Sequence, residues 1–199
     1  PGPRDIYAIW TSPSGIPLTN AFPLIASPAD DTYPSVAYRA APSHDQFVLV
    51  WRDVTGVDVK LNAVELAGYG RALTYGSAVN SIVAGADHGR PSVAANQDGQ
   101  FVVVWSQSAD NRADRDVIGR RLNSNAFPIG PFLRIVDDAA DQTYPSIGAI
   151  QSTGDYLVAW EERRPGEAPD IRIRRLNRNG IPLRIAYDVA GGGPFSFSP

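Results

Sequence analysis

The chain has 199 residues, of which 43% are hydrophobic and 20% are charged, and its net charge is −3. This length and composition suffice for one sizeable hydrophobic core and exclude a disordered chain. The acidic balance offers no basic surface for nucleic acid. The absence of cysteine excludes disulfides and thiolate metal sites. No apolar run reaches the roughly 18 residues that a membrane-spanning helix needs.

Taken in chain order, the sequence predicts short strands joined by turns, and no segment has helical periodicity. Residues 5–10 alternate as a strand does, while Pro17 and Pro23 confine residues 16–26 to an edge strand or an irregular one. Asp98-Gly99 is a typical hairpin turn. The other predicted strands cover residues 34–38, 47–51, 58–66, part of 72–83, 91–95, 101–105, 116–122, 129–136, 145–149, 156–160, 170–173, 181–189 and 194–197.

One pair of strands recurs through the chain. Its first member is typified by Pro-Ser-Val-Ala and its second by Phe-Val-Val-Val-Trp. Trp51, Trp105 and Trp160, which end the second member, stand 54 and 55 residues apart. A period of about 54 residues with four strands per unit is typical of propeller blades, so we predict an all-β propeller that forms a single domain over residues 1–199. The pairs lie at 34–38 with 47–51, 91–95 with 101–105, and 145–149 with 156–160.

The residue types of the repeat suggest where each strand lies in a blade. Small residues suit the first strand to the crowded inner end, a second strand that is apolar on both faces suits a place between neighbouring blades, and prolines suit the fourth to an outer edge. We expect four blades, of which the fourth is assembled from both ends of the chain. The alternative is an open arc completed by another chain or by residues outside this sequence. The complete units are 34–84, 91–137 and 145–189, and the partial units are 1–33 and 194–199.

The units resemble the propeller-like repeats of bacterial secreted and surface proteins. In those repeats Pro-Ser-Val-Ala, an Asp-Gly turn and an aromatic-Val-Val-Val-Trp strand are followed by Asp-Ile, Arg-Leu and a turn of Asn or Asp with Gly. Residues 91–105, 116–122 and 170–180 carry this pattern here. The units are also similar, more distantly, to the blades of TolB-type propellers. The resemblance covers nearly the whole chain, is weakest at 60–83, and implies export and a binding or scaffolding role without catalytic residues.

Three aspartates, Asp30, Asp87 and Asp141, each stand four residues before the proline of the first strand of a unit. They form either a ring of carboxylates at one mouth of the propeller or turns in which their side chains accept backbone N–H hydrogen bonds, and the turn interpretation is favoured. A propeller that hydrolyses glycosides needs paired carboxylates converging at the central mouth. These three aspartates are the only set that the sequence offers for that role.

An oxygen-rich cluster of the kind that calcium prefers lies between the second and third strands of the middle unit. It consists of Asp110, Asn111, Asp114 and Asp116. Its spacing matches no EF-hand loop, and the equivalent loops of the other units lack the cluster. We therefore predict no metal site there.

His44 and His88 are the only histidines, and they lie in different types of turn. Neither has the spacing of a zinc site or the motif of a Ser-His-Asp triad, so we predict solvated turn residues. The sequence thus predicts no catalytic residue, no metal ligand and no cofactor-binding residue.

An arginine cluster follows the start of the last unit. It is either a surface that binds an acidic partner or a solvated face whose salt bridges reach Glu161 and Glu162, and the second interpretation is favoured. The cluster consists of Arg172, Arg174, Arg175 and Arg178.

The tryptophans fall into two groups. Trp51, Trp105 and Trp160 recur at one position of the repeat, which favours packing between blades. Trp10 and its neighbour Tyr7 do not share that position, and they are candidates for a surface that binds sugars or a partner.

These observations favour a non-catalytic extracellular structural or interaction module, a subunit of a larger assembly or filament. The first alternative is a lectin-like module with a site repeated in each blade, although the loops differ in length and composition. A glycoside hydrolase-like propeller is less favoured. We expect a protein partner or self-association, with carbohydrate as another possible ligand. A chain that starts at Pro1 and contains no methionine is expected to be a mature or excised segment located outside the cell or on its surface.

The two ends of the chain predict a gap in the fourth blade. Residues 1–5 resemble the loop at 165–170, so the chain is expected to start just after a second strand, and residues 194–197 are expected to form a first strand. The missing second strand leaves unpaired edges beside a hydrophobic groove, which favours strand addition. We expect an apolar strand from a neighbouring subunit, a partner or an absent part of the same precursor to fill it. Donation between like subunits would polymerise the protein.

Overall fold

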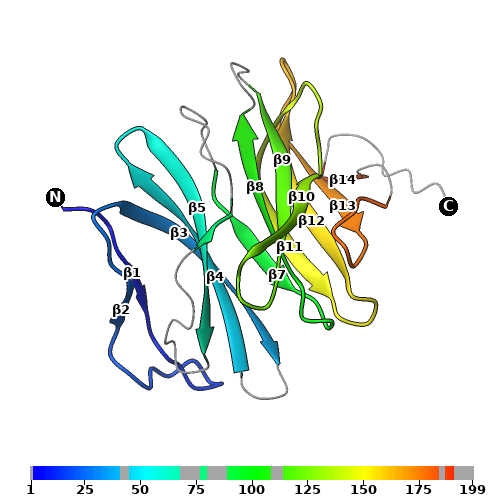
Figure 1. Ribbon diagram of the computed structural model, residues 1–199. Helices are drawn as coiled ribbons and strands as arrows, with labels where there is room; N and C mark the ends of the chain where they lie inside the picture. The colour runs from blue at the N-terminus through cyan, green and yellow to red at the C-terminus, as the bar shows by residue number, and fades with distance from the viewer. Residues whose placement is uncertain are drawn as a thin grey trace.

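The protein is all-β in the computed structural model, which describes residues 2–40, 45–67, 77–79, 89–108, 114–183 and 187–190. The described strands form one two-stranded and three four-stranded antiparallel sheets (Figure 1). They are β1 (Ile6–Ala8), β2 (Phe22–Ile25), β3 (Asp30–Ala40), β4 (Asp45–Thr55), β5 (Asp58–Ala67), β6 (Ser77–Ala78), β7 (Ser92–Ala95), β8 (Phe101–Ser108), β9 (Arg115–Leu122), β10 (Pro128–Arg134), β11 (Asp141–Ile150), β12 (Asp155–Arg163), β13 (Asp170–Leu176) and β14 (Tyr187–Ala190).

Each four-stranded sheet is a meander in which strands pair in sequence order. We call them sheet 1 (β3 to β6), sheet 2 (β7 to β10) and sheet 3 (β11 to β14), and we call β1 and β2 the half-sheet. In every sheet the predicted first strand lies at one edge and the predicted fourth strand at the other. The strand order within each repeat unit is therefore confirmed.

The structure corrects several predicted strand limits. The first strand of sheet 1 and that of sheet 3 begin at Asp30 and Asp141, before the proline, and a bulge at Tyr33-Pro34 and at Tyr144-Pro145 interrupts their pairing. The strand predicted over residues 5–10 is limited to β1, because Ile9 and Trp10 have no regular secondary structure. The residue that stands two positions before the cross-strand partner of the repeated tryptophan is Asp116 in sheet 2 and Asp170 in sheet 3. In sheet 1 it is Lys60, not Asp58 as the sequence spacing suggested. The tight β4–β5 hairpin shifts the repeat by two residues there.

Neighbouring sheets pack face to face. We call the face that carries Trp51, Trp105 or Trp160 the front of its sheet and the opposite face the back. The back of sheet 1 and the front of sheet 2 share one buried cluster, and the back of sheet 2 and the front of sheet 3 share a second. The half-sheet covers part of the front of sheet 1. The three tryptophans are at most 4% exposed, which confirms the prediction that they pack between units.

Equivalent hydrogen bonds link successive sheets. The backbone N–H of Val93 donates to Ser35 Oγ, and that of Ile147 donates to Ser92 Oγ, each at 3.2 Å. Ser35 and Ser92 occupy the same position in the Pro-Ser-Val motif. The serine of the repeat thus ties the first strand of one sheet to the first strand of the next.

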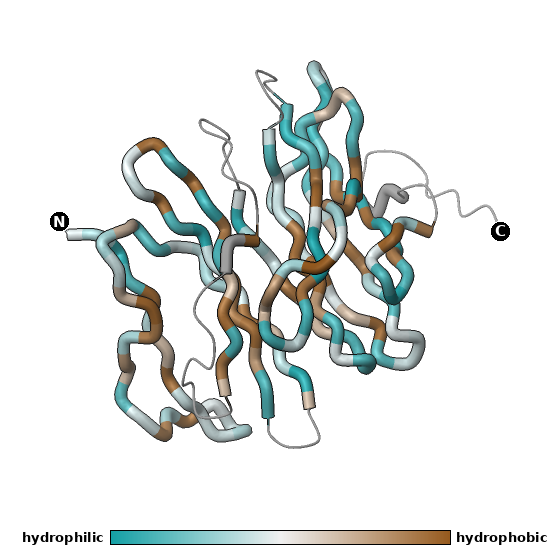
Figure 2. Tube along the Cα trace, viewed as in Figure 1, coloured by the Kyte–Doolittle hydropathy of each residue, from teal (hydrophilic) through white to brown (hydrophobic). Residues whose placement is uncertain are grey.

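The sheets stand in a row whose two ends lie far apart. The half-sheet lies at the left of Figure 1 and sheet 3 at the right. β3 contacts β7 and β7 contacts β11, while the half-sheet contacts β3. Hydrophobic residues run along the strands of every sheet, including the half-sheet (Figure 2). The described residues do not close the predicted four-bladed ring, and residues 194–199, which were expected to contribute to the fourth blade, lie outside them.

We predict that Ser92→Ala lowers the free energy of unfolding by about 1 kcal/mol, because the part-buried N–H of Ile147 loses its acceptor. Ser35→Ala should have a similar effect. Ser146 is the matched control, because it occupies the same repeat position in the last sheet and is exposed. Urea unfolding of the three variants checks this. An equal loss of unfolding free energy in Ser146→Ala would contradict the arrangement in which sheet 3 ends the row, and it would indicate that a further sheet packs against β11.

Candidate functional site

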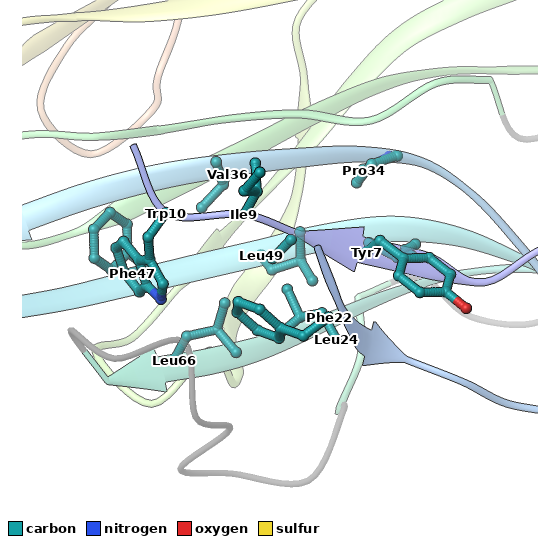
Figure 3. A pocket seen from close by; sticks show the side chains of 12 residues that line it. Tyr7, Ile9, Trp10, Phe22, Leu24, Pro34, Val36, Phe47, Leu49 and Leu66 are labelled. Carbon is teal, nitrogen blue, oxygen red and sulfur yellow. The ribbon is translucent and has the colours of Figure 1, made fainter. Parts of the chain in front are cut away.

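The most distinctive cavity is an apolar groove of about 360 Å³ between the half-sheet and the front of sheet 1. Figure 3 shows its side chains converging from β1, β2, β3, β4 and β5. Its volume falls in the range of small-molecule sites, but its wall has few polar side chains to orient a small ligand. The lining residues are Ile6, Tyr7, Ala8, Ile9, Trp10, Phe22, Leu24, Pro34, Val36, Phe47, Leu49 and Leu66.

Comparison with the other sheets shows why this groove exists. Val36 is 57% exposed, whereas its repeat counterparts Val93 and Ile147 are 6% and 8% exposed. Phe47 is only partly buried, although its counterparts Phe101 and Tyr156 are completely buried. In sheets 2 and 3 the first two strands of the preceding sheet cover these positions. The half-sheet supplies only the counterparts of a third and a fourth strand, so no described strand of the half-sheet covers the inner half of the front of sheet 1.

The groove runs beside a sheet edge that is open in the described part of the chain. β1 pairs with β2 on one side, and no described strand pairs with it on the other. Trp10, just beyond β1, packs edge to face on Phe47 with ring centroids 6.0 Å apart. Tyr38 also contacts the Phe47 ring and is 50% exposed. An unpaired edge beside an apolar face is the arrangement that accepts an added strand.

The uncovered side chains matter because they are contiguous. A single exposed valine is ordinary on a protein surface, and fully burying one contributes about 1.5–3 kcal/mol. In this groove several exposed apolar side chains lie together at repeat positions that are buried in the other sheets. Contiguous exposed apolar patches are typical of interaction surfaces, which makes this groove the candidate site.

The aspartates of the predicted carboxylate ring link neighbouring sheets. Arg4 donates to Asp30 through its backbone N–H at 3.0 Å and its guanidinium at 2.5 Å. In the equivalent place the backbone N–H of Arg115 donates to Asp141 Oδ1 at 3.0 Å. These aspartates accept backbone N–H bonds as the turn interpretation predicted, but the donors belong to the preceding sheet. Asp87 lies outside the described residues.

A second, polar cavity of about 190 Å³ lies where the three first strands begin. The guanidinium of Arg90 stands 4.4 Å from the ring centroid of Tyr33 and 5.7 Å from that of Tyr144. The three residues occupy one repeat position, directly before the proline. Tyr33 and Tyr144 have φ angles of 52° and 53°, a left-handed conformation that costs energy and is frequent at functional sites. Arg52 and Arg115 also line this cavity.

Most of the other candidate residues from the sequence analysis cannot be placed in the fold. His44, His88, Asp110 and Asn111 lie outside the described residues. Asp116 is buried at the start of β9. Within the described ranges, no group of three or more histidine or acidic side chains is arranged to hold a metal ion.

The arginine cluster is distributed over several partners. Arg172 pairs with Glu162 at 2.7 Å, and both side chains are largely buried, so this ion pair is not part of a solvated face. Arg174 donates to the backbone oxygen of Ile135 in sheet 2. The other cluster members pair with aspartates, Arg175 with Asp155 and Arg178 with Asp98.

Sequence reasoning identified Tyr7 and Trp10 as surface candidates but missed Val36, Phe47, Tyr33 and Arg90. Val36 matches its buried counterparts in sequence, so nothing in its own unit signals its exposure. Tyr, Arg and Tyr precede the proline in successive units, and this pattern in the sequence could have identified Tyr33 and Arg90 as candidates.

No protein-family model matches the chain, and no curated protein matches it in sequence. The described segments include no helix with the length and hydrophobicity needed to cross a membrane.

The Arg4 guanidinium, through its hydrogen bond, lowers the pKa of Asp30 from 3.8 to about 2. This pair therefore stabilises the fold above about pH 4, and the contribution is lost as the pH falls toward 2. We predict that Arg4→Gln raises the pKa of Asp30 toward 3.8 and reduces the pH dependence of unfolding in that window. An NMR titration of the Asp30 carboxyl group checks it. Arg134→Gln, which breaks an ion pair with Asp137 elsewhere, is the control and should leave this pKa unchanged.

Proposed function

We propose that this protein is a non-catalytic interaction module that accepts an extended apolar segment as an added strand along β1. The observation that carries the proposal is the groove beside the open β1 edge, with Val36 exposed where Val93 and Ile147 are buried. The proposal includes a finer view of the fold, in which the sheets are propeller blades in an open arc. The resemblance to secreted repeat proteins supports an extracellular or cell-surface location and a role in a larger assembly.

The repeat specifies how the added strand pairs with β1. In sheet 2, Val104 pairs with Gly119 and Val102 pairs with Arg121. Arg4 is the counterpart of Arg115, because both donate a backbone N–H to the aspartate that opens the next sheet. Gly119 then corresponds to Ala8. An added strand equivalent to β8 therefore runs antiparallel to β1 with its Val104 counterpart opposite Ala8.

The same comparison assigns the faces of the added strand. Val102 and Val104 face sheet 3 from the back of sheet 2, whereas Phe101, Val103 and Trp105 face sheet 1 from its front. In the groove, the counterparts of Val102 and Val104 contact the front of sheet 1. Backbone hydrogen bonds to β1 supply affinity, and these alternate side chains supply specificity.

We predict that a peptide with the sequence of residues 100–106 binds the chain. At a concentration about 100 times its Kd it should stabilise the fold by about 2.7 kcal/mol, which is a rise in Tm of about 5–10 °C. A peptide with aspartate at the Val102 and Val104 positions should not bind, while one with aspartate at the Val103 position should. Thermal unfolding and calorimetry measure both. Equal binding of the two altered peptides would contradict the assigned faces.

A variant pair in the chain tests the same site from the other side. Val36→Asp places a charge in the groove and should weaken peptide binding at least about tenfold. Val57→Asp is the matched control, because Val57 is 83% exposed in the β4–β5 turn and lies outside the groove. Indifference of peptide affinity to Val36→Asp would show that the peptide binds elsewhere.

Carbohydrate binding is a second candidate function. The stacked side chains of Tyr33, Arg90 and Tyr144 favour it. Aromatic rings and a cation at one repeat position beside a polar cavity suit a sugar that carries a carboxylate or sulfate group. A glycan array that compares the chain with a Tyr144→Ala variant tests this. Binding of acidic glycans that this variant abolishes would support the lectin alternative, and an empty array would reject it.

A further inference from the structure

The back of sheet 3, at the opposite end of the row, also carries exposed apolar side chains on β12 and β13. Leu157 is 39% exposed, whereas its counterparts Val48 and Val102 in sheets 1 and 2 are completely buried. Ile171 is 41% exposed, whereas its counterparts Leu61 and Val117 are completely buried. These counterparts belong to the clusters in which one sheet covers the back of another. The chain itself shows twice how such a back face is covered. The front of sheet 2 packs on the back of sheet 1, and the front of sheet 3 packs on the back of sheet 2.

The charges on this face do not prevent burial. Leu157 pairs across strands with Arg175, whose guanidinium is 2.7 Å from Asp155. Glu161, also in β12, pairs with Arg163 at 3.3 Å. Ala159 and Ile173 lie on the same face and are partly buried. The face is thus an apolar centre bordered by charges that are already paired.

The outer face of the half-sheet carries the complementary positions. Along β1 and just beyond it, Ile6, Ala8 and Trp10 are more buried than Tyr7 and Ile9, which are 60% and 46% exposed. This alternation in exposure places Tyr7 and Ile9 on the side of the half-sheet opposite Ile6, and both residues also border the groove. This is the front of the half-sheet.

The repeat shows what these two positions contact elsewhere. The counterpart of Tyr7 is Ile118, which packs against the cluster between sheets 1 and 2. The counterpart of Ile9 is Arg120, whose guanidinium donates to the backbone oxygen of Val79 in sheet 1. The Arg120 position therefore contacts the preceding sheet, and the Ile118 position packs against the cluster that the two sheets share. In the half-sheet they are apolar and exposed.

We propose that two copies of this chain associate head to tail, with Tyr7 and Ile9 of one copy docked on the back of sheet 3, around Leu157 and Ile171, of the next. The contact repeats between copies the packing that already joins sheets 1, 2 and 3 within one copy. Because two different faces meet, the association is heterologous and adds copies in one direction. This surface adjoins the strand-accepting groove, which Tyr7 and Ile9 also border, and it extends the proposed function to self-assembly.

Single-face variants and their mixture test the proposal. The back variant is Leu157→Glu with Ile171→Glu, and the front variant is Tyr7→Glu with Ile9→Glu; all four residues are exposed, so the sheets tolerate the changes. In sedimentation equilibrium the mass of the unaltered chain should rise with concentration. Each variant alone should associate at least about tenfold more weakly. An equimolar mixture should stop at twice the chain mass of 21.4 kDa, because one intact front meets one intact back.

Val57→Glu is the control and should assemble like the unaltered chain. The proposal is overturned if the unaltered chain stays monomeric at all concentrations or if the mixture of the two variants forms no dimer. It is also overturned if each variant alone still forms a discrete dimer. Binding of the 100–106 peptide to the back variant separates this result from the proposed function. A monomeric chain that binds the peptide refutes the head-to-tail contact alone, and a chain that assembles without binding the peptide refutes only the groove.

Discussion

The interaction on which this structure depends is the packing of the front of each sheet on the back of the sheet before it. The second strand of a sheet is buried on both faces, as β8 shows from Phe101 to Ser106. Such a strand cannot be stable in an isolated sheet, because half of its apolar surface would stay in water. Stability therefore accumulates along the row, because the main contacts between the described sheets join neighbours, as in other repeat proteins. The inter-sheet bonds made by Ser35 and Ser92 follow the same nearest-neighbour rule.

A row of this kind has two ends, and each end exposes a face that the interior covers. At the half-sheet the exposed part is the inner front of sheet 1, because β1 and β2 replace only the outer two strands of a unit. At sheet 3 it is the back of β12 and β13, where Leu157 and Ile171 are exposed. Val36 and Leu157 are thus exposed for the same reason, although they lie at opposite ends and differ in their expected partners. The proposed strand addition and head-to-tail contact are two ways of covering surfaces that the repeat leaves open.

The sequence was sufficient to predict the strand order and the buried tryptophans, because the residue types within one unit carry that information. It also led us to expect a missing second strand beside β1, and no described strand pairs with that edge. It did not predict that Arg4 is the partner of Asp30. The two residues stand 26 positions apart in neighbouring units, and the repeat motif contains only the acceptor, Asp30. The offset at Lys60 was missed because the tight β4–β5 turn changes the spacing. Whether the row closes depends on the rotation between sheets, which many side chains set together and no single motif encodes.

Hydrogen exchange of the backbone amides along β1, measured on the monomeric chain at high dilution, tests the central claim most directly. An open edge leaves the amides of β1 with few protecting partners, while those of β8 are paired on both sides. The account predicts that β1 exchanges orders of magnitude faster than β8. Protection of β1 equal to that of β8 in the monomer would show that the edge is already covered within one chain and would contradict the account.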